Sequence, residues 1–124
     1  MTFTRDEIMA MSADELRIEI AKKEGFSNFD DRFSDGEGVL LAKSPNSYND
    51  HVPDYPHDIA AAWELVEEMA RNGMLVTFQI SRNVVSILVN TPIFDGSETI
   101  RVNDISASTT ISRAWLIWSE EMGK

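Results

Sequence analysis

Two histidines, His51 and His57, are the side chains of this sequence best suited to acid–base or metal chemistry. Three aspartates are interleaved with them: Asp50, Asp54 and Asp58. Imidazole and carboxylate groups can together hold a divalent metal or transfer protons. Their spacing matches no metal-binding motif, so the alternative is a pair of surface histidines near the start of a helix. We expect the alternative and predict neither a metal site nor a cofactor. A metal-dependent enzyme using both histidines stays the least favoured hypothesis.

An acidic stretch precedes the histidines. Its carboxylates are those of Asp30, Asp31, Asp35 and Glu37. Calcium binds six or more oxygens, and a glycine such as Gly36 permits the sharp turn of a calcium loop. The EF-hand spacing fails, because Phe33 stands where a ligand is required. We therefore expect a solvated acidic loop, whose four carboxylates are candidates for contacting a basic partner protein.

Nucleophilic and redox chemistry find little support in the residue types. The absence of cysteine excludes a thiolate zinc site, an iron–sulfur cluster and a cysteine nucleophile. No serine lies in a nucleophile elbow or beside a histidine motif. The segment Gly36-Glu37-Gly38 is too short for a phosphate-binding loop, and no Lys-Ser or Lys-Thr pair follows it. A non-enzymatic protein is therefore predicted.

Two arginines, Arg101 and Arg113, are the basic residues of the C-terminal half nearest to predicted apolar elements. A guanidinium group binds phosphate or carboxylate. Together with His57, they are candidates for binding a small anionic ligand such as a nucleotide, in a pocket between the sheet and a helix or at a subunit interface. Ion pairs with the many acidic residues are the alternative for both arginines.

The elements that must position these residues follow from hydrophobic periodicity. The length of 124 residues fits a single domain, 1–124, with 43% hydrophobic residues. The predicted elements are N-terminal helices within 4–25, a long acidic loop over 26–57, a central helix over 58–72, a β-meander over 74–103 and a C-terminal helix over 107–122. Capping boxes at Thr4/Glu7 and Ser12/Glu15 mark the first two helix starts.

Residues 74–80 alternate with a period of two, which indicates a strand with Leu75, Thr77 and Gln79 on one face. The β-branched, apolar run 84–89 indicates a second strand, and residues 98–102 a third. Short turn signals join them, so a three-stranded antiparallel sheet is expected. Helices must cover its apolar faces. The predicted fold class is α+β: a three-stranded antiparallel sheet packed between helices, an α/β/α sandwich, with a long acidic loop.

Three tryptophans lie on the apolar stripes of predicted helices. Trp63 and Trp115 are expected in the core. Trp118 stands one turn beyond Trp115 and could instead lie at a dimer contact. Because a three-stranded sheet also leaves edges that need covering, a homodimer is consistent with the sequence.

The segment 55–69, YPHDIAAAWELVEEM, resembles the signature helix of the phage ABA sandwich family of small phage and prophage proteins. The start TRDEI at 4–8 and the segment SRAWL at 112–116 are similar to that family's first turn and closing helix. Residues 26–54 are not covered, and Pro56 stands where the family often has a serine or threonine cap. The resemblance implies a sandwich fold and a phage origin, and it carries no catalytic motif.

The net charge is −10, and half of it lies in residues 26–58. This acidity argues against direct nucleic-acid binding and against an anionic membrane surface. The N-terminus lacks the pattern of a signal peptide, so the bacterial cytoplasm is expected. The favoured function is a non-enzymatic, phage-encoded accessory protein that binds a host protein, for example to inhibit a defence or nucleic-acid-handling system through its acidic surface. The alternative is a protein that binds or sequesters a nucleotide.

Overall fold

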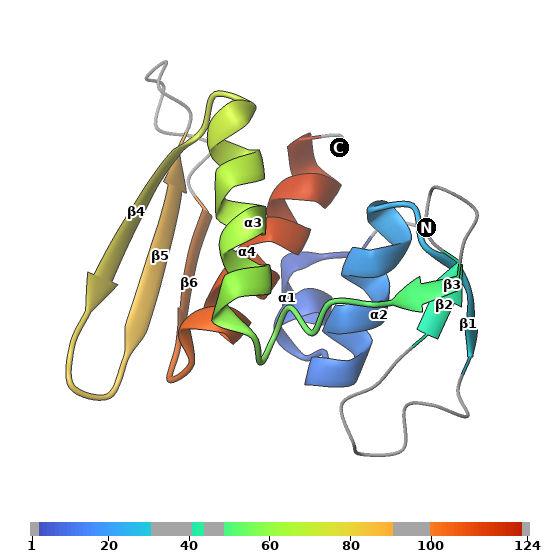
Figure 1. Ribbon diagram of the computed structural model, residues 1–124. Helices are drawn as coiled ribbons and strands as arrows, with labels where there is room; N and C mark the ends of the chain where they lie inside the picture. Colours follow the sequence, from blue (N-terminus) through green and yellow to red (C-terminus); the bar gives the residue numbers. More distant parts are fainter. Residues whose placement is uncertain (1–2, 31–40, 44–48, 91–99, 123–124) are drawn as a thin grey trace.

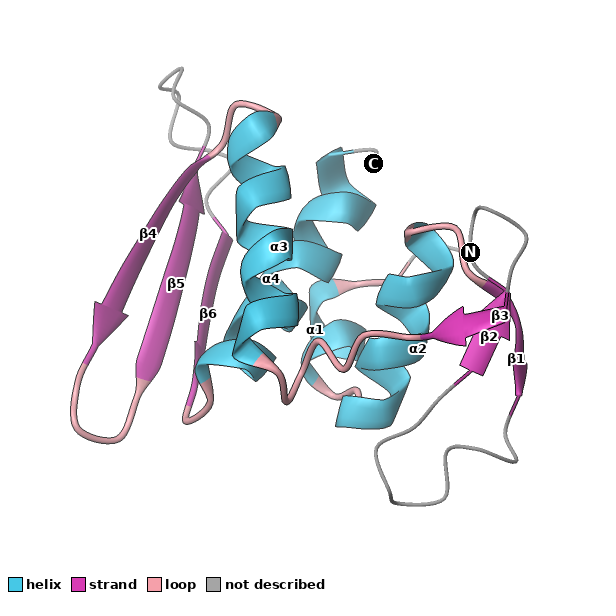
Figure 2. Ribbon diagram, in the orientation of Figure 1, coloured by secondary structure: helices cyan, strands magenta, loops and turns pink. Residues whose placement is uncertain are grey.

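The computed structural model describes residues 3–30, 41–43, 49–90 and 100–122, which form four helices and two three-stranded antiparallel sheets (Figures 1 and 2). The helices are α1 Arg5–Met9, α2 Ala13–Lys23, α3 Ile59–Arg71 and α4 Ala107–Met122. The first sheet contains β1 Ser27–Asp30, β2 Leu41–Lys43 and β3 Asn49–His51. The second contains β4 Leu75–Ile80, β5 Val85–Asn90 and β6 Ile100–Asp104. The predicted α+β class is confirmed.

Local side-chain chemistry defines where the first helices begin. The Thr4 and Ser12 hydroxyls each accept a hydrogen bond from the backbone N–H three residues on, and the glutamate at that position accepts one from the cap's own N–H. Both predicted capping boxes are therefore present. Helices α2 and α3 are followed by Gly25 and Gly73, whose φ angles of +99° and +87° suit glycine.

The β4–β6 sheet is a meander whose two faces differ. Val76 pairs with Val89, which pairs with Ile100, so their side chains share the face that packs on α3 and α4. The sheet was expected between helices, but the described helices all lie along one face (Figure 1). The other face carries exposed residues, including Thr77 and Arg101. Among the described residues of this face only Leu75 and Leu88 are apolar and the others are polar, so the face is stable in water.

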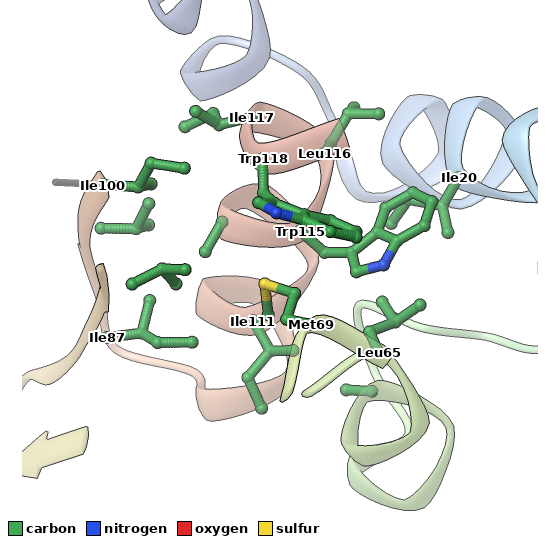
Figure 3. Close-up of a cluster of buried hydrophobic side chains, with 14 of the residues drawn as sticks. Ile20, Leu65, Met69, Ile87, Ile100, Ile111, Trp115, Leu116, Ile117 and Trp118 are labelled. Carbon is green, nitrogen blue, oxygen red and sulfur yellow. The ribbon is translucent and has the colours of Figure 1, made fainter. Parts of the chain in front are cut away.

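Helix α4 is the centre of the molecule. Figure 3 shows Ile87 and Ile100 of the sheet on one side of it and Ile20 of α2 on the other. Trp115 is completely buried, as predicted. Trp118 is only 4% exposed, so it is not the dimer contact suggested by its position in the sequence. At 16 residues α4 is the longest described helix, and none of the described helices has the length and apolarity needed to cross a membrane.

The segment predicted as a long loop, 26–57, contains the three short strands of the first sheet. Strand β2 pairs with both β1 and β3, and Leu41 lies opposite His51. A small cluster built from Ala21, Ala42 and Val52 packs this sheet on α2. The Arg17 guanidinium donates a 2.6 Å hydrogen bond to the Val52 carbonyl, which attaches the chain after β3 to α2.

Candidate functional site

The two histidines lie on different elements. His51 is exposed on β3, and His57 is exposed in the turn before α3. The His57 Nδ1 atom lies 3.0 and 3.1 Å from the two carboxylate oxygens of Asp54. Asp58 caps α3, because its carboxylate accepts a 3.0 Å hydrogen bond from the Ala60 N–H. Within the described ranges there is no group of three histidine or acidic side chains that could hold a metal ion.

The candidate ligand residues Arg101, Arg113 and His57 have separate surroundings. Arg113 pairs with Asp104 at the end of β6 and donates a 3.2 Å hydrogen bond to the Met11 carbonyl. It thereby joins the sheet, α4 and the turn after α1. Arg101 is exposed on the uncovered face of the sheet. The structure does not bring the three side chains into one pocket, and of the three only Arg101 lines a hollow on that face.

The acidic stretch falls largely outside the described residues. Asp31, Asp35 and Glu37 are outside them, and Asp30 is described only as the last backbone position of β1. Contact between these carboxylates and a basic partner stays a prediction.

The face of the β4–β6 sheet that no described helix covers is the candidate site, and we name it the open face. Its described residues are Leu75, Thr77, Gln79, Ser86, Leu88, Asn90, Arg101 and Asn103. Two cross-strand rows organise the face. Thr77, Leu88 and Arg101 lie side by side in one row. Gln79, Ser86 and Asn103 form the next, where the Ser86 hydroxyl donates a 2.5 Å hydrogen bond to the Asn103 side-chain oxygen.

A shallow hollow of about 70 Å³ lies between these rows, with Arg101 at its rim. Among the described residues of the open face Arg101 is the one charged side chain, in a chain whose net charge is −10. The neighbouring Asp104 does not oppose it, because Asp104 projects to the helix-covered side and pairs with Arg113. Leu88 is half-buried beside Arg101. The open face can therefore accept an apolar group, hydrogen-bonding groups and one negative charge.

Exposed apolar side chains also occur where α3 meets β4, namely Ile59 and Trp63 of α3 and Ile80 of β4, and we name these three with the partly buried Phe78 the Trp63 patch. The prediction that Trp63 is a core residue is wrong, because its side chain is 48% exposed. Its ring stacks on Phe78 with centroids 5.9 Å apart and planes 24° apart. The buried stripe of α3 consists of Ala62, Leu65, Val66 and Met69. The stripe that faces the core is therefore offset by about one residue from the predicted stripe, which contained Trp63. As a result, Ile59 and Trp63 lie at the edge of the core.

Tyr55 is a buried titratable group close to several carboxylates. Burial raises the pKa of its phenol, and the negative charges of Glu24, Glu64 and Glu68 raise that pKa further. Its hydroxyl therefore stays protonated at neutral pH and cannot act as a base. Glu68 also accepts a 3.1 Å hydrogen bond from the Trp115 indole N–H. These contacts stabilise the junction of α3 and α4.

Sequence reasoning identified Arg101 but did not identify the rest of the open face. The signal was present in the alternation of Leu75, Thr77 and Gln79, which correctly predicted that these three side chains share a face. The face was missed because both faces were expected to be covered by helices. Comparisons with family models, with curated proteins and with solved structures found no match to this chain. The resemblance to the phage ABA sandwich family stays a prediction.

Proposed function

We propose that the protein is a non-enzymatic, phage-encoded accessory protein that binds a protein of its bacterial host through the open face. The observation that carries this proposal is the three-stranded sheet face that no described helix covers, with Leu88 of the central strand beside Arg101 of the edge strand β6. The family resemblance is the reason to look for the partner in the bacterial cytoplasm. Inhibition of a host defence or nucleic-acid-handling system is the role we propose for such binding.

The composition of the open face supports a protein partner. Protein interfaces are depleted of charge at their centre and enriched in arginine, and they use hydrogen bonds at intervals over a flat area. The open face has one arginine, one central leucine, and hydroxyl and amide groups from Thr77, Gln79 and Ser86. A partner that fits presents a carboxylate to Arg101 and an apolar side chain to Leu88.

The nucleotide alternative is less well supported by the size of the hollow. Sites for small molecules usually enclose roughly 300–1,000 Å³. The hollow beside Arg101 has a volume of about 70 Å³, which suits one side chain of a partner better than a whole nucleotide. A thermal-shift screen with nucleotides tests this alternative, because a bound ligand raises the unfolding temperature.

We propose the acidic stretch as a second contact with the partner protein. Its negative charge is opposite in sign to the charge of Arg101. Carboxylates at Asp30, Asp31, Asp35 and Glu37 would meet a basic region of the partner and compete there with phosphate groups. Substitution separates the two surfaces. Replacing these four residues by their amides tests the acidic stretch, whereas Arg101→Glu tests the open face.

The decisive experiment is a pull-down from bacterial lysate with tagged wild-type protein, Arg101→Glu and Arg82→Glu. Arg82 lies exposed in the hairpin between β4 and β5, so Arg82→Glu makes the same charge change outside the open face. We expect a host protein that wild type and Arg82→Glu capture equally and that Arg101→Glu captures at least tenfold less. Purified partner should then bind with the same order of affinities. Equal binding by all three proteins would refute the open face as the interface.

A further inference from the structure

The two edge strands of the β4–β6 sheet, β4 and β6, differ in how well they are protected against pairing with a further strand. Strand β6 has Arg101 and Asp104 among its five residues, and charges on an edge strand discourage pairing with another strand. Strand β4, Leu75–Ile80, has no charged residue and no proline. Within the described chain it pairs only with β5, so its outer N–H and C=O groups face away from the sheet.

The side chains beside this edge are apolar and exposed. Ile80, at the end of β4, is 73% exposed, and Ile59, on the first turn of α3, is 53% exposed. Trp63 of α3 stacks on Phe78 of β4. An unpaired strand edge next to exposed apolar side chains is the usual site of strand addition. The occupant must supply a strand, together with apolar side chains on the helix side.

We propose that this occupant is a second copy of the chain, joined by antiparallel pairing of β4 with β4 of the partner. A two-fold axis at Phe78 puts Val76 of one copy opposite Ile80 of the other, and Thr77 opposite Gln79. Apolar side chains then meet on the helix side and polar side chains on the open side, so the strand complements itself. The two Trp63 patches lie on the same side of the joined sheet and cover each other.

Charge favours this edge for self-association. Two copies with a net charge of −10 repel each other, so contact is least costly along a strand that has no carboxylate, although Glu64 and Glu67 of the neighbouring α3 are exposed. Residues 74–90, which contain β4, the hairpin and β5, have a single charged residue, Arg82. The resulting dimer has a six-stranded sheet with both open faces on one side. This inference does not depend on the host partner, because the open face stays uncovered.

Sedimentation velocity over a range of protein concentrations tests the dimer, with Ile80→Lys as the disrupting variant. Ile105→Lys is the matched control, because Ile105 is 82% exposed and follows β6 at the opposite edge. We expect wild type and Ile105→Lys to dimerise with the same dissociation constant, and Ile80→Lys to raise that constant at least tenfold. A wild-type protein that remains monomeric at every concentration would overturn the proposal.

Cysteine crosslinking tests the strand register, since the chain has no native cysteine. Thr77→Cys puts a thiol next to the proposed two-fold axis, whereas Asn103→Cys puts one on the outer strand of the same face. Across six strands spaced about 4.8 Å apart, the two thiols of the Asn103→Cys dimer are separated by more than about 20 Å. A short bis-maleimide should crosslink the Thr77→Cys dimer and leave the Asn103→Cys dimer without a covalent link between its subunits. Equal crosslinking of the two variants would contradict the β4 interface. So would the absence of crosslinking in both variants if they sediment as dimers.

Discussion

The two sheets of the protein have the same number of described strands but very different support. The β4–β6 sheet packs its apolar face on α3 and α4, and Ile87, Val89, Ile100 and Val102 are essentially excluded from water. The β1–β3 sheet packs on α2 through Ala21, Ala42 and Val52, with partly buried residues such as Phe29 around them. Burial of apolar surface dominates the free energy of folding, so the larger sheet contributes most of the stability.

This difference in packing predicts a difference in stability, because burial of apolar surface contributes more than the strand hydrogen bonds that both sheets have. Both sheets are antiparallel, and both leave edges unpaired among the described residues. The larger one has a central helix against it, whereas the smaller one depends on a few side chains and on the hydrogen bond from Arg17 to the Val52 carbonyl. We therefore expect the smaller sheet to open locally without unfolding of the rest.

The largest effect is expected in the core of the β4–β6 sheet. Ile100 is fully buried, so Ile100→Ala removes apolar contacts and leaves a cavity. The expected loss is about 2–5 kcal/mol of the free energy of unfolding. Chemical denaturation followed by tryptophan fluorescence measures it. Ile105→Ala, at an exposed position, should change that free energy by less than about 0.5 kcal/mol. Similar losses for both variants would contradict the assignment of the core.

A smaller effect is expected in the cluster beneath the β1–β3 sheet. Val52→Ala removes two methyl groups from a buried position and should cost about 1–2 kcal/mol. Amide hydrogen exchange shows which part of the protein is destabilised by the substitution. We expect faster exchange of the amides near β3, and unchanged protection of β5 and α4, because local opening of the smaller sheet leaves the main core intact. Uniformly faster exchange would mean that the two sheets unfold as one unit.

The smallest effect concerns the connection between the two regions. Glu120 of α4 lies 2.7 Å from the Lys23 ammonium of α2 and accepts a 3.0 Å hydrogen bond from the Phe3 N–H. Burial alone would raise the pKa of Glu120, but these two hydrogen bonds together with the positive charge of Lys23 outweigh it and lower the pKa below its ordinary value of 4.5. A lowered folded-state pKa stabilises the protein above about pH 4.5, and this contribution is lost as the pH falls through the folded-state pKa.

Glu120→Gln tests this connection. The wild-type protein should lose under about 1 kcal/mol from this group on acidification below about pH 4.5, and the variant should show a correspondingly flatter pH profile. Urea denaturation at several pH values measures the slope. Glu121, whose pKa is lowered by its hydrogen bonds with Arg5, titrates in the same range and stays intact as an internal reference. Identical slopes for variant and wild type would show that Glu120 does not link α4 to α2.

Local chemistry made the helices and the second sheet predictable. The capping boxes that begin at Thr4 and Ser12 can be recognised from residues three positions apart. The alternation in β4 can be recognised from six consecutive residues. The first sheet was not predicted, because its partners are distant in sequence. Ser27 pairs with Lys43, and Leu41 with His51, through short strands containing Asn and Asp, which have low strand propensity.

The candidate site was harder to predict, because exposure depends on which elements are neighbours. Trp63 and Trp115 both lie on apolar helical stripes, yet only Trp115 faces the core. The sequence pattern of α3 does not determine the rotation of the helix about its axis to better than one residue. That rotation decides whether Trp63 faces the core or the solvent. Likewise, no spacing rule distinguishes Arg113, which pairs with Asp104, from Arg101, which is exposed.

The central position of α4 has a consequence for synthesis on the ribosome. Every element that α4 contacts, from α1 to β6, precedes it in the chain and is made first. The sheet and the α1–α2 pair cannot bury their apolar faces against α4 until residues 107–122 have emerged. We expect nascent chains to expose hydrophobic surface during that interval, so that chaperone binding and aggregation compete with folding until α4 is available.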